Sequence, residues 1–151
     1  MKDSLKIKQQ LFEACLQFVN NRSLTIKQMM NSNQKALLSE TKSSAGDKHE
    51  TGRAMLQLEM EKASQQLASV QQMREVLTKI SIEKTSKVSC LGSVVITNKA
   101  TYYLAISAGK IPVKNIDYFA VSINSPIGKQ LLGSSVGDVI AFNDTKIIEI
   151  Y

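Results

Sequence analysis

The sequence has no Trp, and aromatic residues make up only 5% of its 151 residues. It has two Pro and seven Gly, and none of these lies before Gly46. Because Gly and Pro are the residues that most disfavour a helix interior, their absence permits a long, uninterrupted helix at the start of the chain. Few aromatics favour helices packed through Leu, Met and Ala over one large globular core.

Metal-binding and nucleophilic residues are also scarce. Cys15, Cys90 and the single His49 are far apart in the sequence and form no CxxC pair or zinc motif. We expect two buried or half-buried thiols in a reducing compartment, Cys15 in a helix and Cys90 in a strand. The chain lacks a nucleophile elbow and a phosphate-binding Gly loop, so we expect neither a stand-alone enzyme nor a cofactor of its own.

Long apolar runs are missing as well. No stretch approaches the roughly 18 apolar residues of a membrane span, and the first ten residues lack the apolar core of a signal peptide. We therefore expect a cytoplasmic protein with no membrane contact. The net charge of +6 is uneven, because residues 1–87 carry 14 basic and 9 acidic residues. This basic excess supports solubility and permits contact of the N-terminal part with DNA or RNA.

Residues 1–84 have the apolar spacing of a pair of helices. A seven-residue repeat runs through Leu5, Phe12, Val19 and Ile26. After a polar segment at residues 40–53, a second stripe alternates by four and three: Leu56, Met60, Ala63, Leu67, Val70 and Leu77. Narrow stripes of this kind pack against another helix. The pattern predicts an antiparallel coiled-coil hairpin with its tip at about residues 41–52, with a dimeric helical bundle as the alternative.

Residues 88–151 change to a strand-like pattern. Apolar positions begin at Val88 and Leu91, and strands are predicted at residues 94–97, 101–107, 118–123, 139–142 and 146–150, with a loop around Pro112. A short helix is predicted at residues 125–133, because Ser125 suits the cap, Pro126 the first position and Gly133 the end. These features predict a compact domain with five or so strands, and hence an α+β fold for the whole chain.

Two short motifs make the sequence resemble a known family. Residues 123–133 read INSPIGKQLLG, VGDV follows at residues 136–139, and residues 46–50 read GDKHE. They are similar to the NSPIxxxLLG, VGD and GDxxE motifs of the Gre-type (GreA/GreB) transcript cleavage factors, and the resemblance covers nearly the whole chain. It implies an N-terminal coiled-coil hairpin, a C-terminal FKBP-like antiparallel domain without isomerase activity, and binding at the secondary channel of RNA polymerase.

The resemblance also assigns residues to functions. It implies that Asp47 and Glu50 assist the polymerase in cleaving backtracked RNA, by holding a transient Mg²⁺ shared with the polymerase active site near the RNA 3′ end. Hard carboxylate oxygens are the ligands that Mg²⁺ prefers, and residues three apart lie on one side of a helix. Asn124, Ser125 and Pro126 match the segment that docks on the polymerase rim.

Several alternatives stay open at the level of sequence. Asp47 and Glu50 can instead form a capping box at a helix start, and Ser125 and Pro126 can simply begin their helix. Lys48 and His49 stand where the family more often has Leu-Ser, and Thr51 replaces its Asn. These departures leave open a channel binder that modulates or inhibits transcription without cleavage. A coiled-coil adaptor with another partner is the alternative of a different class.

Overall fold

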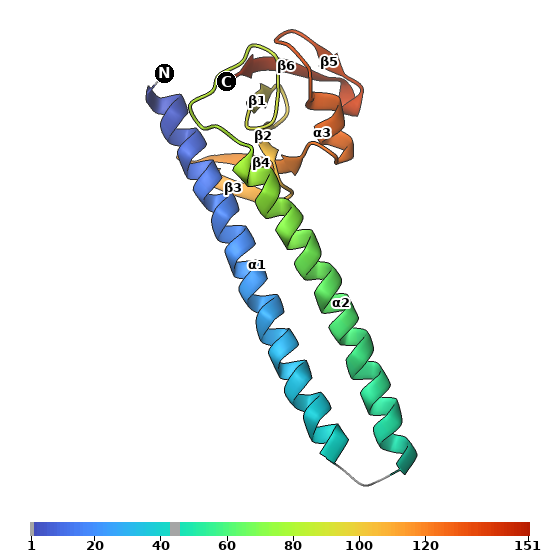
Figure 1. Cartoon of the computed structure of the whole chain (residues 1–151). Helices are drawn as coiled ribbons and strands as arrows, with labels where there is room; N and C mark the ends of the chain where they lie inside the picture. The colour runs from blue at the N-terminus through green and yellow to red at the C-terminus, as the bar shows by residue number, and fades with distance from the viewer. Residues whose placement is uncertain (1, 43–45) are drawn as a thin grey trace. The chain divides into compact units, whose positions relative to one another are not determined.

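The computed structural model describes the backbone of residues 2–42 and 46–151, and the side chains of residues 3–39 and 51–151. The chain is α+β, with two long helices followed by a six-stranded sheet (Figure 1). It divides into two compact units. Val19–Met73 forms one, and the residues up to Phe18 form the other together with Arg74–Tyr151. No described helix has an apolar stretch long enough to span a membrane.

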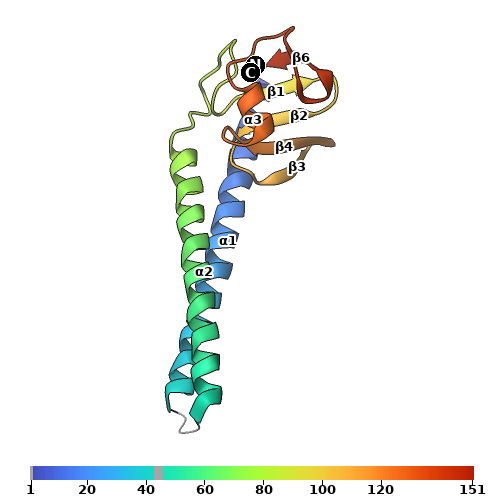
Figure 2. The same cartoon turned by 90° about the vertical axis from the view of Figure 1, so that its right-hand side faces the viewer.

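The unit Val19–Met73 contains the later part of α1 (Lys2–Lys42) and most of α2 (Gly46–Thr78), and the two helices run alongside each other in opposite directions (Figures 1 and 2). Its buried seam is mainly apolar: Val19 and Ile26 of α1 and Ala63 and Val70 of α2 are at most 3% exposed, with the polar Ser23 at 5% between the first two. The α2 stripe predicted from the sequence is confirmed. All of its positions are buried or half-buried, namely Leu56, Met60, Ala63, Leu67, Val70 and Leu77.

The break between the helices is shorter than the predicted polar turn. Residues 40–42 continue α1, and residues 46–53 already belong to α2. Each residue added to an existing helix gains a backbone hydrogen bond without a new nucleation step. This gain outweighs the roughly 1 kcal/mol that Gly52 costs within a helix.

The buried side of α1 begins one position away from the predicted one. Leu11 and Cys15 are fully buried. The predicted Phe12 is only half-buried, and Leu5 is 43% exposed. This first part of α1 belongs to the unit that holds the sheet, and the backbone of Ile106 hydrogen-bonds to the Cys15 thiol. In this first part of α1, packing against the sheet therefore determines which side of the helix is buried. The seven-residue repeat, which indicates packing between two helices, does not predict that side.

The strands form one mixed sheet in the order β3-β4-β2-β1-β6-β5. Its elements are β1 (Val94–Thr97), β2 (Thr101–Ala105), β3 (Gly109–Val113), β4 (Ile116–Ser122), β5 (Val139–Ile140) and β6 (Thr145–Ile150), with α3 (Pro126–Leu131) between β4 and β5 and a 3₁₀ turn, η1 (Phe142–Asp144), before β6. β2 and β4 pair in parallel. The predicted antiparallel arrangement is therefore wrong at this pair. β3 lies at the edge and runs antiparallel to β4, and β4 returns between β3 and β2 in the same direction as β2.

β3 occupies a segment that the sequence analysis assigned to a loop. Pro112 lies opposite Asp117 of β4, and β3 is at the edge of the sheet. An edge strand tolerates Pro because one row of its N–H groups has no strand partner. Gly109 begins this strand with a φ of 78°, which residues other than Gly rarely adopt.

Residues 88–91 form no strand, contrary to the prediction, and Cys90 is half-buried in this irregular segment. Ser89 instead binds the loop after α3. Its N–H donates to Ser134 O at 2.9 Å, and its carbonyl accepts from Gly133 N at 2.8 Å. These bonds satisfy the backbone as a strand partner would, so the apolar spacing here reflects burial and not sheet pairing.

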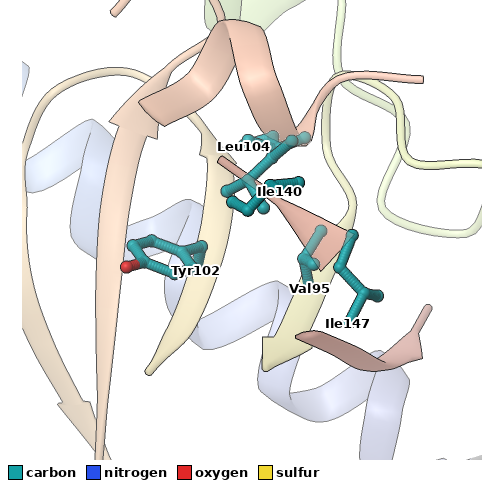
Figure 3. Close-up of a cluster of buried hydrophobic side chains, with 6 residues drawn as sticks. Val95, Tyr102, Leu104, Ile140 and Ile147 are labelled. Atoms are coloured by element: carbon teal, nitrogen blue, oxygen red, sulfur yellow. The ribbon is translucent and has the colours of Figure 1, made fainter. Parts of the chain in front are cut away.

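The central strands β1 and β2 are buried on both faces of the sheet. A cluster under α3 contains Val95, Tyr102, Leu104, Leu131, Ile140 and Ile147 (Figure 3). Val94 and Val95 are both 0% exposed, although consecutive strand residues point to opposite faces. The first part of α1 covers the second face, where Tyr103 is 1% exposed beside Cys15. Burial on both sides explains why these strands read as continuous apolar runs.

The two cysteines are expected to differ sharply in reactivity. Burial raises the pKa of the Cys15 thiol to about 12, whereas Cys90 is half-buried. Because the thiolate is the reactive form, iodoacetamide near pH 8 should label Cys90 at least about a hundredfold faster than Cys15. Peptide mass spectrometry measures both rates. The Cys90→Ser variant should stay nearly unlabelled until denaturant is added, and rapid labelling of that folded variant would contradict the burial of Cys15.

Candidate functional site

The two acids that the sequence assigns to polymerase chemistry lie at the start of α2. Asp47 is the second residue of that helix and Glu50 the fifth. Their side chains, like those of Lys48 and His49, lie outside the described residues, so their metal-binding and catalytic roles stay predictions. The N–H groups at a helix start carry partial positive charge, which favours acidic residues at these positions.

The helices pack more loosely toward this end of their unit. Among the side chains that the structure describes, Ile26 is the last fully buried residue of α1 and Ala63 the first of α2. Closer to the turn, Leu38 is 57% exposed and Met55 is 62% exposed. Large apolar side chains that a helix pair leaves in solvent are available to a partner.

The turn before α3 has the local structure that the sequence predicts. Ser125 is the N-cap, and its hydroxyl accepts from Gly128 N at 3.1 Å and donates to Ser122 O at 2.6 Å. Pro126 occupies the first helical position, and Asn124 N donates to the Ser122 hydroxyl at 3.1 Å. The predicted capping role of Ser125 and the predicted place of Pro126 are both confirmed.

The three residues assigned to polymerase contact differ in what they present to solvent. Asn124 and Pro126 are exposed, and Ser125 is half-buried. The Ser125 hydroxyl is already hydrogen-bonded within the turn. Asn124 and Pro126 are therefore the members available to a partner, while Ser125 holds the turn in shape. Contact with a polymerase stays a prediction for all three.

Gly128 is a structural requirement of this turn that the sequence analysis passed over. A Cβ atom at Gly128 would lie 1.8 Å from Ser122 O and 2.9 Å from the Ser125 hydroxyl oxygen. The turn can therefore close only around a residue without a side chain. The sequence does contain a hint of this requirement. Gly128 lies inside the six-residue helix α3, and because Gly is unfavourable in a helix, its presence there indicates a steric need for a residue without a side chain.

Lys8 is a buried cation that the sequence analysis also missed. It is 3% exposed, and its Nζ donates to Lys84 O at 3.0 Å. Burial lowers the pKa of the Lys8 ammonium, and electrostatic interaction with Cys90 partly opposes that effect. Lys8 lies on the same buried side of α1 as Leu11 and Cys15, three and seven residues later, and the seven-residue repeat in the sequence does not predict that side.

The remaining side chains form no metal centre. Within residues 3–39 and 51–151, no three His, Cys, Asp or Glu side chains gather as metal ligands would. The metal role that the sequence resemblance implies is assigned to Asp47 and Glu50. Their carboxylate oxygens are the kind of donor that Mg²⁺ prefers, and Mg²⁺ commonly takes only one or two such groups from a protein.

No protein-family model matches the chain, and no curated protein matches its sequence. Among solved structures, that of the transcription factor Gfh1 aligns with 93% of this chain over 92% of its own length. The two chains are 19% identical, and the TM-score is 0.35.

Proposed function

We propose that this protein binds RNA polymerase and stimulates Mg²⁺-dependent cleavage of backtracked RNA, with the tip between α1 and α2 placed in the secondary channel. The supporting observation is the location of the two Gre-like motifs. GDKHE at residues 46–50 begins α2, and NSPIG at residues 124–128 forms a tight turn with Asn124 and Pro126 exposed. In this proposal α1 and α2 act as the coiled-coil hairpin, and the sheet domain is the FKBP-like part that contacts the polymerase rim.

In this proposal the polymerase active site hydrolyses the RNA, and this chain only assists it. A two-metal site stabilises both the attacking and the leaving oxygen of a phosphoryl transfer. Asp47 would offer a carboxylate oxygen to the more weakly held Mg²⁺, and Glu50 would help to orient the attacking water. The protein then acts on the RNA 3′ end indirectly, without a cofactor of its own.

The experiment is a stalled, backtracked polymerase complex with RNA labelled at its 5′ end. Adding the protein with Mg²⁺ is expected to shorten the RNA from its 3′ end. The double variant Asn124→Ala, Pro126→Ala should bind polymerase at least about tenfold more weakly, because it removes the exposed side chains of the docking turn. Lys110→Ala, an exposed change on edge strand β3, is the matched control and should bind as the wild type does.

Lys48 and His49 favour a second candidate function, a channel binder that modulates or inhibits transcription without cleavage. A Lys between the two acids places a positive charge beside the proposed metal and opposes its binding. Tight polymerase binding with unchanged RNA length and a slower rate of elongation would select this second candidate. Failure to bind polymerase at all would exclude both.

A further inference from the structure

A groove of ≈ 740 Å³ lies beside Lys8, within the unit that holds the sheet. Its walls come from the first turns of α1, from residues 82–87 after α2, and from the end of β6 and Tyr151. Small-molecule sites in proteins typically have volumes of roughly 300–1,000 Å³. The groove is therefore large enough for a small organic ligand, and it is distinct from both the helix turn and the Asn124–Pro126 turn.

Lys8 lines the groove, and the charged neighbour that acts on it electrostatically is a thiol, Cys90, and not a carboxylate. The Lys8 ammonium has three N–H donors, and among the described residues its hydrogen-bond acceptor is Lys84 O. Within the described side chains, no carboxylate forms an ion pair with it. The residue as a whole is only 3% exposed, much less than a Lys that extends along the surface into solvent. Buried charges are normally paired, so this one calls for an anionic partner.

The other residues that line the groove indicate the size of the ligand's apolar part and the number of its negative charges. Leu5, Ile82, Ile150 and Tyr151 provide apolar surface. Glu83 and Glu149 are exposed at the margin, and they oppose a ligand with several negative charges. A single anionic group with an apolar body satisfies both conditions, whereas a nucleotide polyphosphate does not.

We propose that this groove binds a small monocarboxylate with an apolar body, whose carboxylate accepts hydrogen bonds from Lys8 Nζ. The apolar body lies along Leu5, Ile82 and Ile150. Charge-assisted hydrogen bonds from an ammonium to a carboxylate are among the strong ones, and burial at this depth strengthens them further. The inference does not depend on the proposed function, and its test requires no polymerase.

The test is an NMR titration of the full chain with octanoate. Saturable shifts are expected at backbone amides that line the groove, such as those of Lys8, Ser86 and Ile150. Acetate, inorganic phosphate and neutral octanamide should each bind at least about tenfold more weakly, because each lacks either the apolar body or the single charge. Equal binding of phosphate or octanamide, or shifts confined to residues 19–73, would overturn the assignment.

Two variants test the role of Lys8 itself. Lys8→Met keeps the length of the side chain and removes its charge, so octanoate should bind at least about tenfold more weakly. Lys87→Met removes an exposed charge from the same groove and should change the affinity by less than about twofold. If Lys8→Met does not fold, the role of Lys8 can be tested in the wild type by following the ¹³Cε resonance of Lys8 during the octanoate titration. It should shift with the same midpoint as the amides, and an unchanged resonance would refute the proposal.

Discussion

Asp47→Asn is expected to slow transcript cleavage by about a hundredfold or more, with no change in polymerase affinity, if the proposed function is correct. Asn keeps the size of the side chain and one oxygen, but it removes the negative charge that a hard Mg²⁺ ion needs. Loss of one electrostatic contact to the reacting centre typically slows an enzyme by about 10²–10³-fold. Glu50→Gln should have a smaller effect, roughly tenfold, because its proposed role is to orient water.

The measurement is the single-turnover rate of RNA shortening at saturating protein, so that weaker binding cannot mimic slower chemistry. Glu61→Gln removes an exposed acid from the same helix and is the matched control, with wild-type rates expected. Raising the Mg²⁺ concentration should partly rescue Asp47→Asn, because the variant is deficient in metal recruitment. A helix-capping role alone predicts no such rescue, and wild-type cleavage by Asp47→Asn would rule out the metal role.

Gly128→Ala is expected to destabilise the sheet domain by about 2–4 kcal/mol, the combined magnitude of core overpacking and a lost helix cap. The added Cβ would lie 1.8 Å from Ser122 O, so the backbone of the turn must move. That movement breaks the Ser125 hydrogen bonds and displaces α3, which carries the fully buried Leu131 into the core. The docking turn should be lost with it, so polymerase binding should weaken as well.

Urea unfolding followed by Tyr fluorescence measures this effect, because all four Tyr residues lie in the sheet domain. Two controls separate the contributions. Ser125→Ala removes only the cap and should cost about 1 kcal/mol. Gly109→Ala meets no atom within 4 Å, so only its φ of 78° is unfavourable, and it should cost about 1 kcal/mol. A Gly128→Ala domain as stable as either control would show that the turn relaxes without strain.

Local features of the fold could be predicted from the sequence because short-range spacing encodes them. The α2 stripe follows from apolar residues on one side of a helix, and every predicted position is buried or half-buried. The α3 boundaries follow from a Ser cap, a Pro at the first position and a Gly with a φ of 79° after the end. Each signal depends on residues within a few positions of one another.

Long-range packing decided the features that the sequence analysis missed. A lysine at position 8 is expected in solvent from the sequence, whereas in the folded domain it is 3% exposed and lines a groove together with residues after α2. The parallel pairing of β2 with β4 depends on the order of strands in space, which alternation along one strand does not encode.

For this protein, the sequence by itself determined the α+β class, the α2 seam, the capped turn at Asn124–Pro126 and the positions of Asp47 and Glu50 at a helix start. Only the tertiary structure decided the buried side of α1 near Leu11, the edge strand at Pro112 and the groove at Lys8. The physical reason is that helix period and capping are local properties of the chain, whereas burial depends on which distant surface packs against each residue.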